Sequence, residues 1–405
     1  MTTVEEWPAG HPRILVTDSW LANAGDAAAS LGTEAMLRAL YRDASIVHAA
    51  YQYEELGPLV GDLHFVAPLE DLIGTSWSPP AGRWQETGDR FVDDADVVVC
   101  QAGGALVEAY QPIARGAALS KVVDRGIPLV MLGFTLSPFS RARARRDLGR
   151  VLRSSSLVAV RDQRSVAVAE SFGALDVVLG TDPALFLFGD VPRESTRAQI
   201  SVLLTTHHPV EERRAAMFEA ACLVLREVAQ RSRGESLHIW STVQGMPTLA
   251  REDDLSVAKA VLERLSPLAS PVHLEEDYIA PRRAIEIVAR SRALVTMRMH
   301  PCLFAACQNT PFALLLDGQR TGVLAGTGLE GRLANPFDPD GIRRVIEAAL
   351  ATEPDSTDFR RNLEPLRSRL DLMVTRLGEA IERAVDGRRS SLVATPAVGR
   401  DTSSG

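Results

Sequence analysis

Short apolar runs alternate with stretches of helical spacing along most of this chain, and this alternation constrains its fold more than any other feature. The runs at 96–100, 126–132 and 157–160 are typical of buried strands, and each is followed by a stretch with helical periodicity. Strands and helices that alternate at this interval form parallel units joined by right-handed crossovers. The sequence therefore predicts an α/β fold.

The alternation stops once and then restarts. Residues 189–196 are polar, contain one proline and lack periodicity, so they are predicted to form a linker. A chain of 405 residues is also too long for one ordinary domain. We expect two Rossmann-like domains, residues 1–190 and 191–386, that face each other across a central cleft. The remaining residues, 387–405, are rich in Ser, Thr, Gly and Arg and are predicted to form a disordered tail.

Composition narrows the class of protein. Hydrophobic residues make up 46% and charged residues 24% of the chain, as in soluble globular proteins. No apolar run approaches the roughly 20 residues that cross a bilayer, and the first residues lack the basic and apolar regions of a signal peptide. A net charge of −8 argues against general nucleic-acid binding. The four cysteines lack CxxC spacing, so we expect reduced thiols and a cytoplasmic protein.

The stretch 293–307 carries the densest group of chemically useful side chains. Its apolar start predicts a strand that ends at Arg298, and His300 follows at the mouth of a small-residue helix, with Met299 between them. Ligands of open α/β sheets bind at the carboxyl ends of strands, and the free N–H groups of a helix start favour an anion. Spacing alone thus predicts an anion pocket, with a purely structural role as the alternative.

Polar residues also follow the first predicted strand. Asn23 and Asp26 could face a ligand there, with Gly25 between them allowing the backbone to approach closely. Asparagine and aspartate are equally favoured as helix caps. On spacing alone, capping is at least as well supported as binding.

A glycine pair, Gly103 and Gly104, follows the buried strand at 96–100. The pair could let a ligand approach the backbone, or it could form a plain tight turn. The chain has no GxGxxG sequence after its first strand and no Walker A sequence, which disfavours nicotinamide and P-loop chemistry.

Two charged residues end later strands of the first half. Arg161 follows the run at 157–160, where an arginine can hold a phosphate or carboxylate in bidentate fashion. Its alternative is a surface pair with Asp162, which would cap the next helix. Asp182 precedes Pro183, and a role in the turn is as well supported as a role in binding.

Histidines and arginines elsewhere in the chain support weaker hypotheses about binding and catalysis. His207 and His208 follow the first strand of the second half, but adjacent histidines need further ligands to hold a metal, so no metal site is predicted there. His207 could line the cleft and transfer protons near neutral pH. Six arginines between 141 and 153 form a basic helix, best explained as a solvated face. Attraction to an anionic acceptor or a membrane surface is its alternative.

Taken in order, these segments resemble the polysaccharide pyruvyl transferase family. Each match is short, but their order and spacing over about residues 13–330 make the joint resemblance specific. The matching segments are 23–26, 96–104, 127–133, 160–165, 181–184, 297–300 and 310–311.

The resemblance implies a glycosyltransferase-B-like architecture and transfer of pyruvate from phosphoenolpyruvate to hydroxyls of a sugar or glycan, usually as a cyclic ketal. It implies no separate cofactor and no metal, a donor-binding second domain and an acceptor side in the first. The acceptor could be lipid-linked, which would suit peripheral membrane association.

The resemblance also implies roles for residues of this chain. It places the donor-binding arginines at Arg298 and Arg161 and matches His300 to the family histidine, which would protonate the enol carbon or the departing phosphate. Asp26 would deprotonate or orient the acceptor hydroxyl. Asn23 and Asp182 would position these groups.

The chain departs from the family pattern after the second strand of the 293–316 region. A lysine is common there, whereas this chain has Arg320, which could substitute as a cation. The segment 134–138 is also more apolar than usual, and both differences bear on the acceptor more than on the donor. Two other functions stay open: a nucleotide-sugar-dependent glycosyltransferase of similar architecture, and a non-catalytic homologue that binds an anionic glycan.

Overall fold

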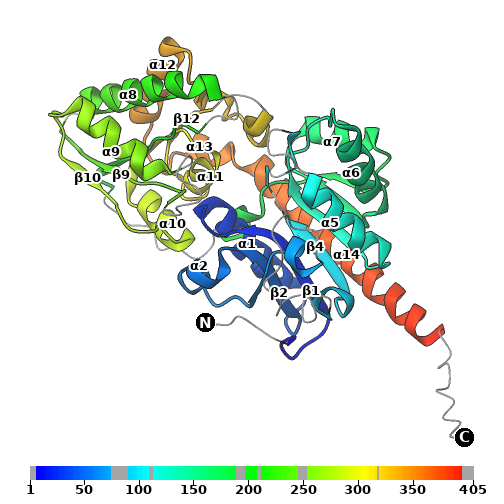
Figure 1. Cartoon of the computed structure of the whole chain (residues 1–405). Helices are drawn as coiled ribbons and strands as arrows, with labels where there is room; N and C mark the ends of the chain where they lie inside the picture. The colour runs from blue at the N-terminus through cyan, green and yellow to red at the C-terminus, as the bar shows by residue number, and fades with distance from the viewer. Residues whose placement is uncertain are drawn as a thin grey trace, which may run out of the picture.

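Two parallel sheets flanked by helices make up the protein (Figure 1). The computed structural model describes residues 6–73, 90–101, 103–104, 106–108, 113–187, 197–207, 211–232, 234–244, 253–316 and 319–394. The first sheet has the strand order β3-β2-β1-β4-β5-β6-β7 and the second β10-β9-β8-β11-β12-β13, with every described strand pair parallel. The predicted α/β class is confirmed.

The first unit alternates strands and helices from the N-terminus. Its central strands are fully buried, because helices cover both faces of the sheet, and this accounts for their continuous apolar runs. Its elements are β1 (Arg13–Trp20), α1 (Ala24–Leu40), β2 (Ser45–Tyr51), α2 (Tyr53–Val60), β3 (Phe65–Val66), α3 (Leu69–Leu72), β4 (Val97–Gln101), α5 (Ile113–Asp124), β5 (Leu129–Phe134), α6 (Ala142–Ser154), β6 (Leu157–Val160), α7 (Gln163–Ser171), β7 (Val177–Leu179) and the 3-10 helix η2 (Pro183–Leu187).

The second unit repeats the pattern, and the linker predicted before it lies outside the described residues. Its elements are β8 (Gln199–Leu203), the 3-10 turn η3 (Glu211–Arg213), α8 (Arg214–Arg231), β9 (Ser236–Ile239), α9 (Asp254–Leu265), β10 (Val272–Leu274), α10 (Pro281–Ala289), β11 (Ser291–Thr296), α11 (Met299–Cys307), β12 (Phe312–Leu315), the 3-10 turns η5 (Gln319–Leu324) and η6 (Glu330–Arg332), β13 (Leu333–Ala334), α12 (Pro339–Ala351) and α13 (Thr357–Arg361).

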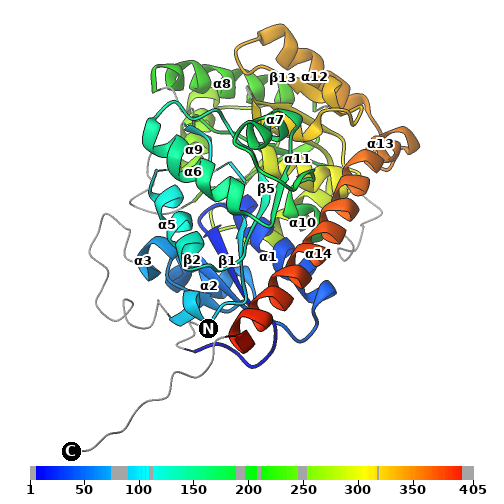
Figure 2. The ribbon, with the colours of Figure 1, turned by 90° about the vertical axis from the view of Figure 1, so that its right-hand side faces the viewer.

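The last helix, α14 (Glu364–Ala394), returns to the first unit (Figure 2). Its buried residues Met373, Leu377 and Ile381 recur at helical spacing and pack against strands of the first sheet. Assigning residues 191–386 wholly to the second unit was therefore wrong for this helix. The helix also continues through Ala394, so the tail predicted from residue 387 begins no earlier than residue 395.

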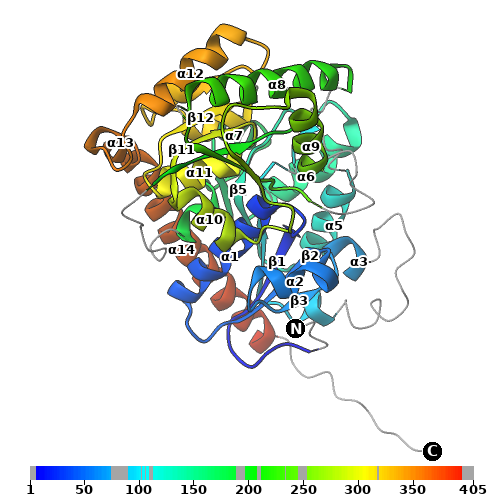
Figure 3. The same cartoon turned by 90° about the vertical axis from the view of Figure 1, so that its left-hand side faces the viewer.

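The two units meet where α1 and η2 of the first lie against α10 and α11 of the second; α1, α10 and α11 are labelled in Figure 3. Within the first unit, η2 packs tightly on α1, since a side chain at Gly32 would place its Cβ 2.0 Å from the carbonyl oxygen of Pro183. Two hydrogen bonds also join the units: Ala24 N donates to the Thr242 carbonyl at 2.8 Å, and the side-chain Oη of Tyr278 donates to the Leu21 carbonyl at 2.7 Å. The start of α1 is thus held by both units.

Within the residues that the structure describes, none of the helices is both long and apolar enough to cross a bilayer.

Packing of α14 on the first sheet predicts a measurable difference between two leucines of one helix. Leu377 is fully buried, whereas Leu372 is 48% exposed. We expect Leu377→Ala to lower the free energy of unfolding by about 2–5 kcal/mol, because it opens a cavity. Leu372→Ala should change it by less than about 0.5 kcal/mol. Denaturant titrations of the two variants compare these values, and equal effects would contradict the packing.

Candidate active site

His300 lies in the first turn of α11, directly after the carboxyl end of β11. The strand ends because Arg298 adopts an extended conformation at the helix N-cap, where its backbone N–H donates to Thr296 Oγ1 at 3.0 Å. The His300 side chain is 11% exposed. The histidine is thus fixed beside the free backbone N–H groups of a helix start, as the sequence predicted.

The groups facing His300 come from the first unit. Its Nε2 lies 3.4 Å from Oδ2 of Asp182, after β7, and 4.0 Å from Oδ1 of Asp26, in the first turn of α1. The backbone of Gly25 lies against the ring, since an added Cβ there would sit 2.2 Å from Nδ1 of His300. The imidazole therefore fills the space that a side chain at position 25 would need.

Asp182 joins His300 to Arg161. Arg161 Nη1 donates to Oδ2 of Asp182 at 2.6 Å, and Nε donates to Thr135 Oγ1 at 2.9 Å. Both charged side chains are almost fully buried. Burial opposes ionisation of Asp182, but the charges of His300 and Arg161 outweigh it and lower the pKa of the carboxyl. Asp182 is thus a fixed anion between Arg161 and His300.

Asp26 has the opposite character. Loss of water around its carboxyl raises its pKa, and the nearby Asp182 adds to this, while His300, Arg161 and Arg115 act against it. Two carboxyls that face one histidine therefore differ in proton affinity. Such a pair is the usual basis for dividing acid and base roles.

The predicted glycine pair covers these groups. Gly103 has φ +45°, and a Cβ there would lie 3.4 Å from Nη1 of Arg161 and 3.5 Å from Oδ1 of Asp26. At Gly104 a Cβ would lie 3.8 Å from Nη2 of Arg161. The turn thus brings backbone, without side chains, over the arginine and the carboxylate.

Arg298 makes a separate ion pair within the second unit. Its Nη2 donates to Oδ1 of Asp254 at 2.7 Å, and its Nε lies 3.1 Å from Oδ2. Asp254 begins α9 and is fully buried, whereas the Arg298 side chain is 12% exposed. The carboxylate therefore fixes the guanidinium in one orientation at the N-cap of the helix that carries His300.

Of the other residues predicted for the site, some lie next to the groups around His300 and others do not contact them. Asn23 caps α1, its Oδ1 accepting from Gly25 N at 2.9 Å, so the capping alternative describes its contact. Met299 is buried in the core between the units. His207 lies beyond β8, where its N–H donates to Thr205 Oγ1, and His208 lies outside the described residues.

Arg320 lies in η5, and its side chain is not among those described. The same turn reaches the first unit, because a Cβ at Gly322 would lie 2.9 Å from the Asp162 side chain. Arg320 is therefore carried by a segment next to the residue that follows Arg161.

Two residues of the site were missed in the sequence. Thr135 holds Arg161 from a segment noted only as unusually apolar. Asp254 belongs to an acidic run before a predicted helix, and helix capping by Asp253, whose Oδ1 accepts from Leu255 N, is enough to explain that run. The sequence signal that could have identified Asp254 is that it directly follows Asp253, because one aspartate is enough to cap the helix.

Comparison with protein families identifies the family of this chain. The model of the polysaccharide pyruvyl transferase family matches residues 23–316, well over half of the chain. The chain belongs to the polysaccharide pyruvyl transferase family. It is accordingly a transferase, and the matched region contains every residue described around His300. A comparison with curated protein sequences gave no match.

Solved structures with the same fold are distant in sequence. MnaA of S. aureus in complex with UDP has a TM-score of 0.56 and 12% identity, over 95% of this chain and 97% of that one. UDP-GlcNAc 2-epimerase from Neisseria meningitidis, bound to UDP-GlcNAc, has a TM-score of 0.55 and 14% identity, over 94% of this chain and 100% of that one. HepE from Anabaena in complex with UDP-glucose has a TM-score of 0.53 and 15% identity, over 94% of this chain and 100% of that one. This family member therefore has a glycosyltransferase-B-like fold of two Rossmann-like units.

The contrast between the two carboxyls predicts opposite effects on stability. The pKa of Asp26 is raised on folding, so its ionised form destabilises the fold above that pKa and has no effect below the unfolded value of about 3.9. Asp26→Asn should therefore raise Tm at neutral pH, with the gain vanishing as the pH falls towards that value. Melting curves across this pH range measure the effect.

Asp182→Asn is the matched comparison. The lowered pKa of Asp182 means that its ionised form stabilises the fold above the unfolded pKa, and this stability is lost as pH falls through the folded value. Removing this charge leaves Arg161 buried without its partner, at a cost of about 3–5 kcal/mol at neutral pH. Equal shifts for both variants would contradict the assignment.

Proposed function

We propose that this transferase moves pyruvate from phosphoenolpyruvate onto two hydroxyls of a sugar or glycan, forming a cyclic ketal and releasing phosphate. One observation carries the proposal: His300 of the second unit faces the Arg161–Asp182 ion pair and Asp26 of the first. This joins an acid–base histidine to fixed cations without requiring a metal.

The donor would be held by cations from both units. Phosphoenolpyruvate carries a phosphate and a carboxylate, and guanidinium groups bind both in bidentate fashion. Arg298 and the first N–H groups of α11 suit one anionic group. Nη2 of Arg161, on the side of Gly104, suits the other. Asp182 and Asp254 keep the two guanidinium groups oriented before the donor arrives.

The first step would add an acceptor hydroxyl to C2 of the donor. Asp26, whose raised pKa suits a base, accepts the hydroxyl proton. His300 in its protonated form donates a proton to C3, which becomes the methyl group. The product is an adduct in which C2 carries the sugar oxygen, the methyl group, the carboxylate and the phosphate.

The second step would close the ketal. A neighbouring hydroxyl attacks C2 while the bond from C2 to the phosphate oxygen breaks. His300, now neutral, accepts the proton of this hydroxyl, and the proton held by Asp26 leaves with the phosphate. Over both steps, one hydroxyl proton ends on the methyl group and the other on phosphate.

The acceptor would approach from the first unit, on the side of Asp26. The basic helix α6 is the surface considered for a lipid-linked acceptor, and the side chains of Arg143 and Arg146 on it are 65% and 73% exposed. Both already pair with Asp147 of the same helix. We therefore assign α6 as a solvated face and keep the acceptor class as a sugar or glycan.

Phosphate release from phosphoenolpyruvate, measured with a panel of sugar acceptors, tests the proposal. His300→Ala should lower kcat about 10²–10⁴-fold while donor binding persists. Arg298→Ala should weaken donor binding instead. His64→Ala, a half-buried histidine of the first unit, is the control and should leave both unchanged.

Two outcomes would overturn the proposal. One is wild-type protein that neither binds nor turns over phosphoenolpyruvate. The other is stabilisation by a nucleotide diphosphate sugar together with acceptor glycosylation, which would support the glycosyltransferase alternative.

Position 25 gives an independent test of the imidazole position. A methyl group in Gly25→Ala would overlap the His300 ring, so we expect kcat to fall at least 10²-fold, as for loss of a general acid. Alanine favours the helix, so the fold should persist. Gly331→Ala is the control, since a Cβ there meets nothing within 4 Å. An active Gly25→Ala enzyme would remove His300 from the reaction.

A further inference from the structure

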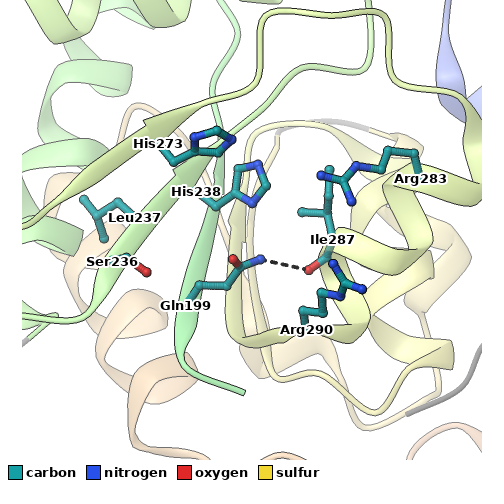
Figure 4. A pocket seen from close by; sticks show the side chains of 8 residues that line it. All are labelled: Gln199, Ser236, Leu237, His238, His273, Arg283, Ile287 and Arg290. Atoms are coloured by element: carbon teal, nitrogen blue, oxygen red, sulfur yellow. Dashed lines mark hydrogen bonds between the residues drawn. The ribbon is translucent and has the colours of Figure 1, made fainter. Parts of the chain in front are cut away.

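Two histidines and a glutamate lie together at the edge of the second sheet. His238 on β9 and His273 on the edge strand β10 are register partners, so their side chains project from the same face of adjacent parallel strands. Their rings lie edge to face with centroids 4.7 Å apart, beside the pocket in Figure 4. Glu275 follows β10 by one residue.

The donor atoms of these three side chains converge. Oε2 of Glu275 lies 3.2 Å from Nε2 of His238 and 3.8 Å from Nε2 of His273. One ligand atom from each residue can be chosen so that all three lie within 4.8 Å of one another, the one such group found in the part of the chain that the structure describes. Two ligands of a tetrahedral zinc ion are about 3.3–3.5 Å apart. The group needs only small rotations to meet that spacing.

The chemistry of the donor set selects the ion. Two imidazole nitrogens and one carboxylate oxygen suit zinc and its neighbours, whereas magnesium and calcium take mostly oxygen ligands. A pocket of about 250 Å³ adjoins both histidines, so a water molecule or small anion has room to be the fourth ligand.

The carboxylate of Glu275 already forms an ion pair with an arginine, which would compete with a metal ion. Arg283 on α10 donates from Nη2 to Oε2 of Glu275 at 3.1 Å, and its side chain is 39% exposed. A metal ion would displace this guanidinium, which can turn towards solvent because of that exposure. The cost of displacement makes Arg283 a determinant of metal affinity.

We propose that His238, His273 and Glu275 form a binding site for a divalent transition-metal ion of the zinc class. The ion joins the three-residue edge strand β10 to β9, and so stabilises the second unit at a distance from the proposed reaction. The site stands apart from the proposed function, since none of its residues contributes to the chemistry around His300.

Titration of chelator-treated full-length protein with zinc chloride tests this site by calorimetry and thermal melting. We expect one equivalent to bind and Tm to rise with zinc concentration. His273→Ala should weaken zinc binding at least tenfold. We expect this variant to fold normally, because the His273 side chain is 65% exposed. Magnesium chloride should give neither binding nor stabilisation.

Arg283→Gln and His64→Ala sharpen the result. The first removes the competing cation and should tighten zinc binding, an effect that a general loss of structure would not produce. The second removes a histidine of the other unit and should leave binding unchanged. Wild-type protein that binds no zinc would overturn the proposal, as would binding that His273→Ala and Arg283→Gln both leave unaltered.

Discussion

The buried ion pair between Arg161 and Asp182 is the interaction on which the rest of the site depends. It spans 2.6 Å with almost no exposure, so removing either partner would leave an uncompensated charge. The pair keeps Asp182 ionised, and Asp182 in turn faces His300 from the other unit. This one interaction therefore keeps the charge on Asp182 in the first unit, and Asp182 in turn helps to position His300 in the second.

Much of the fold could be predicted from the sequence because strands buried on both faces must be continuously apolar. That pattern gave β4, β5, β6 and β11 and the parallel α/β class. The position of α14 could not be predicted in the same way. Its periodicity identifies a buried stripe, but a stripe does not specify which of two apolar sheets it covers, and the chain returns to the first.

The residues at strand ends were predictable as candidates for a site because parallel topology gathers carboxyl ends at one edge. Their partners were not, since Thr135 and Asp254 act through contacts that only the tertiary structure creates. The pairing of His238 with His273 was not predictable for the same reason, since it also depends on the tertiary structure. Each is one histidine in its own strand, and only the register of β9 with β10 pairs them.

The central claim is that His300, Arg161 and Arg298 serve a single donor site at the junction of the two units. A structure of the protein with bound phosphoenolpyruvate measures this most directly. The account predicts the donor at the start of α11, with one anionic group on each arginine and C3 within about 4 Å of the His300 ring, near hydrogen-bond reach. Phosphoenolpyruvate bound away from His300, or contacting only one unit, would contradict it.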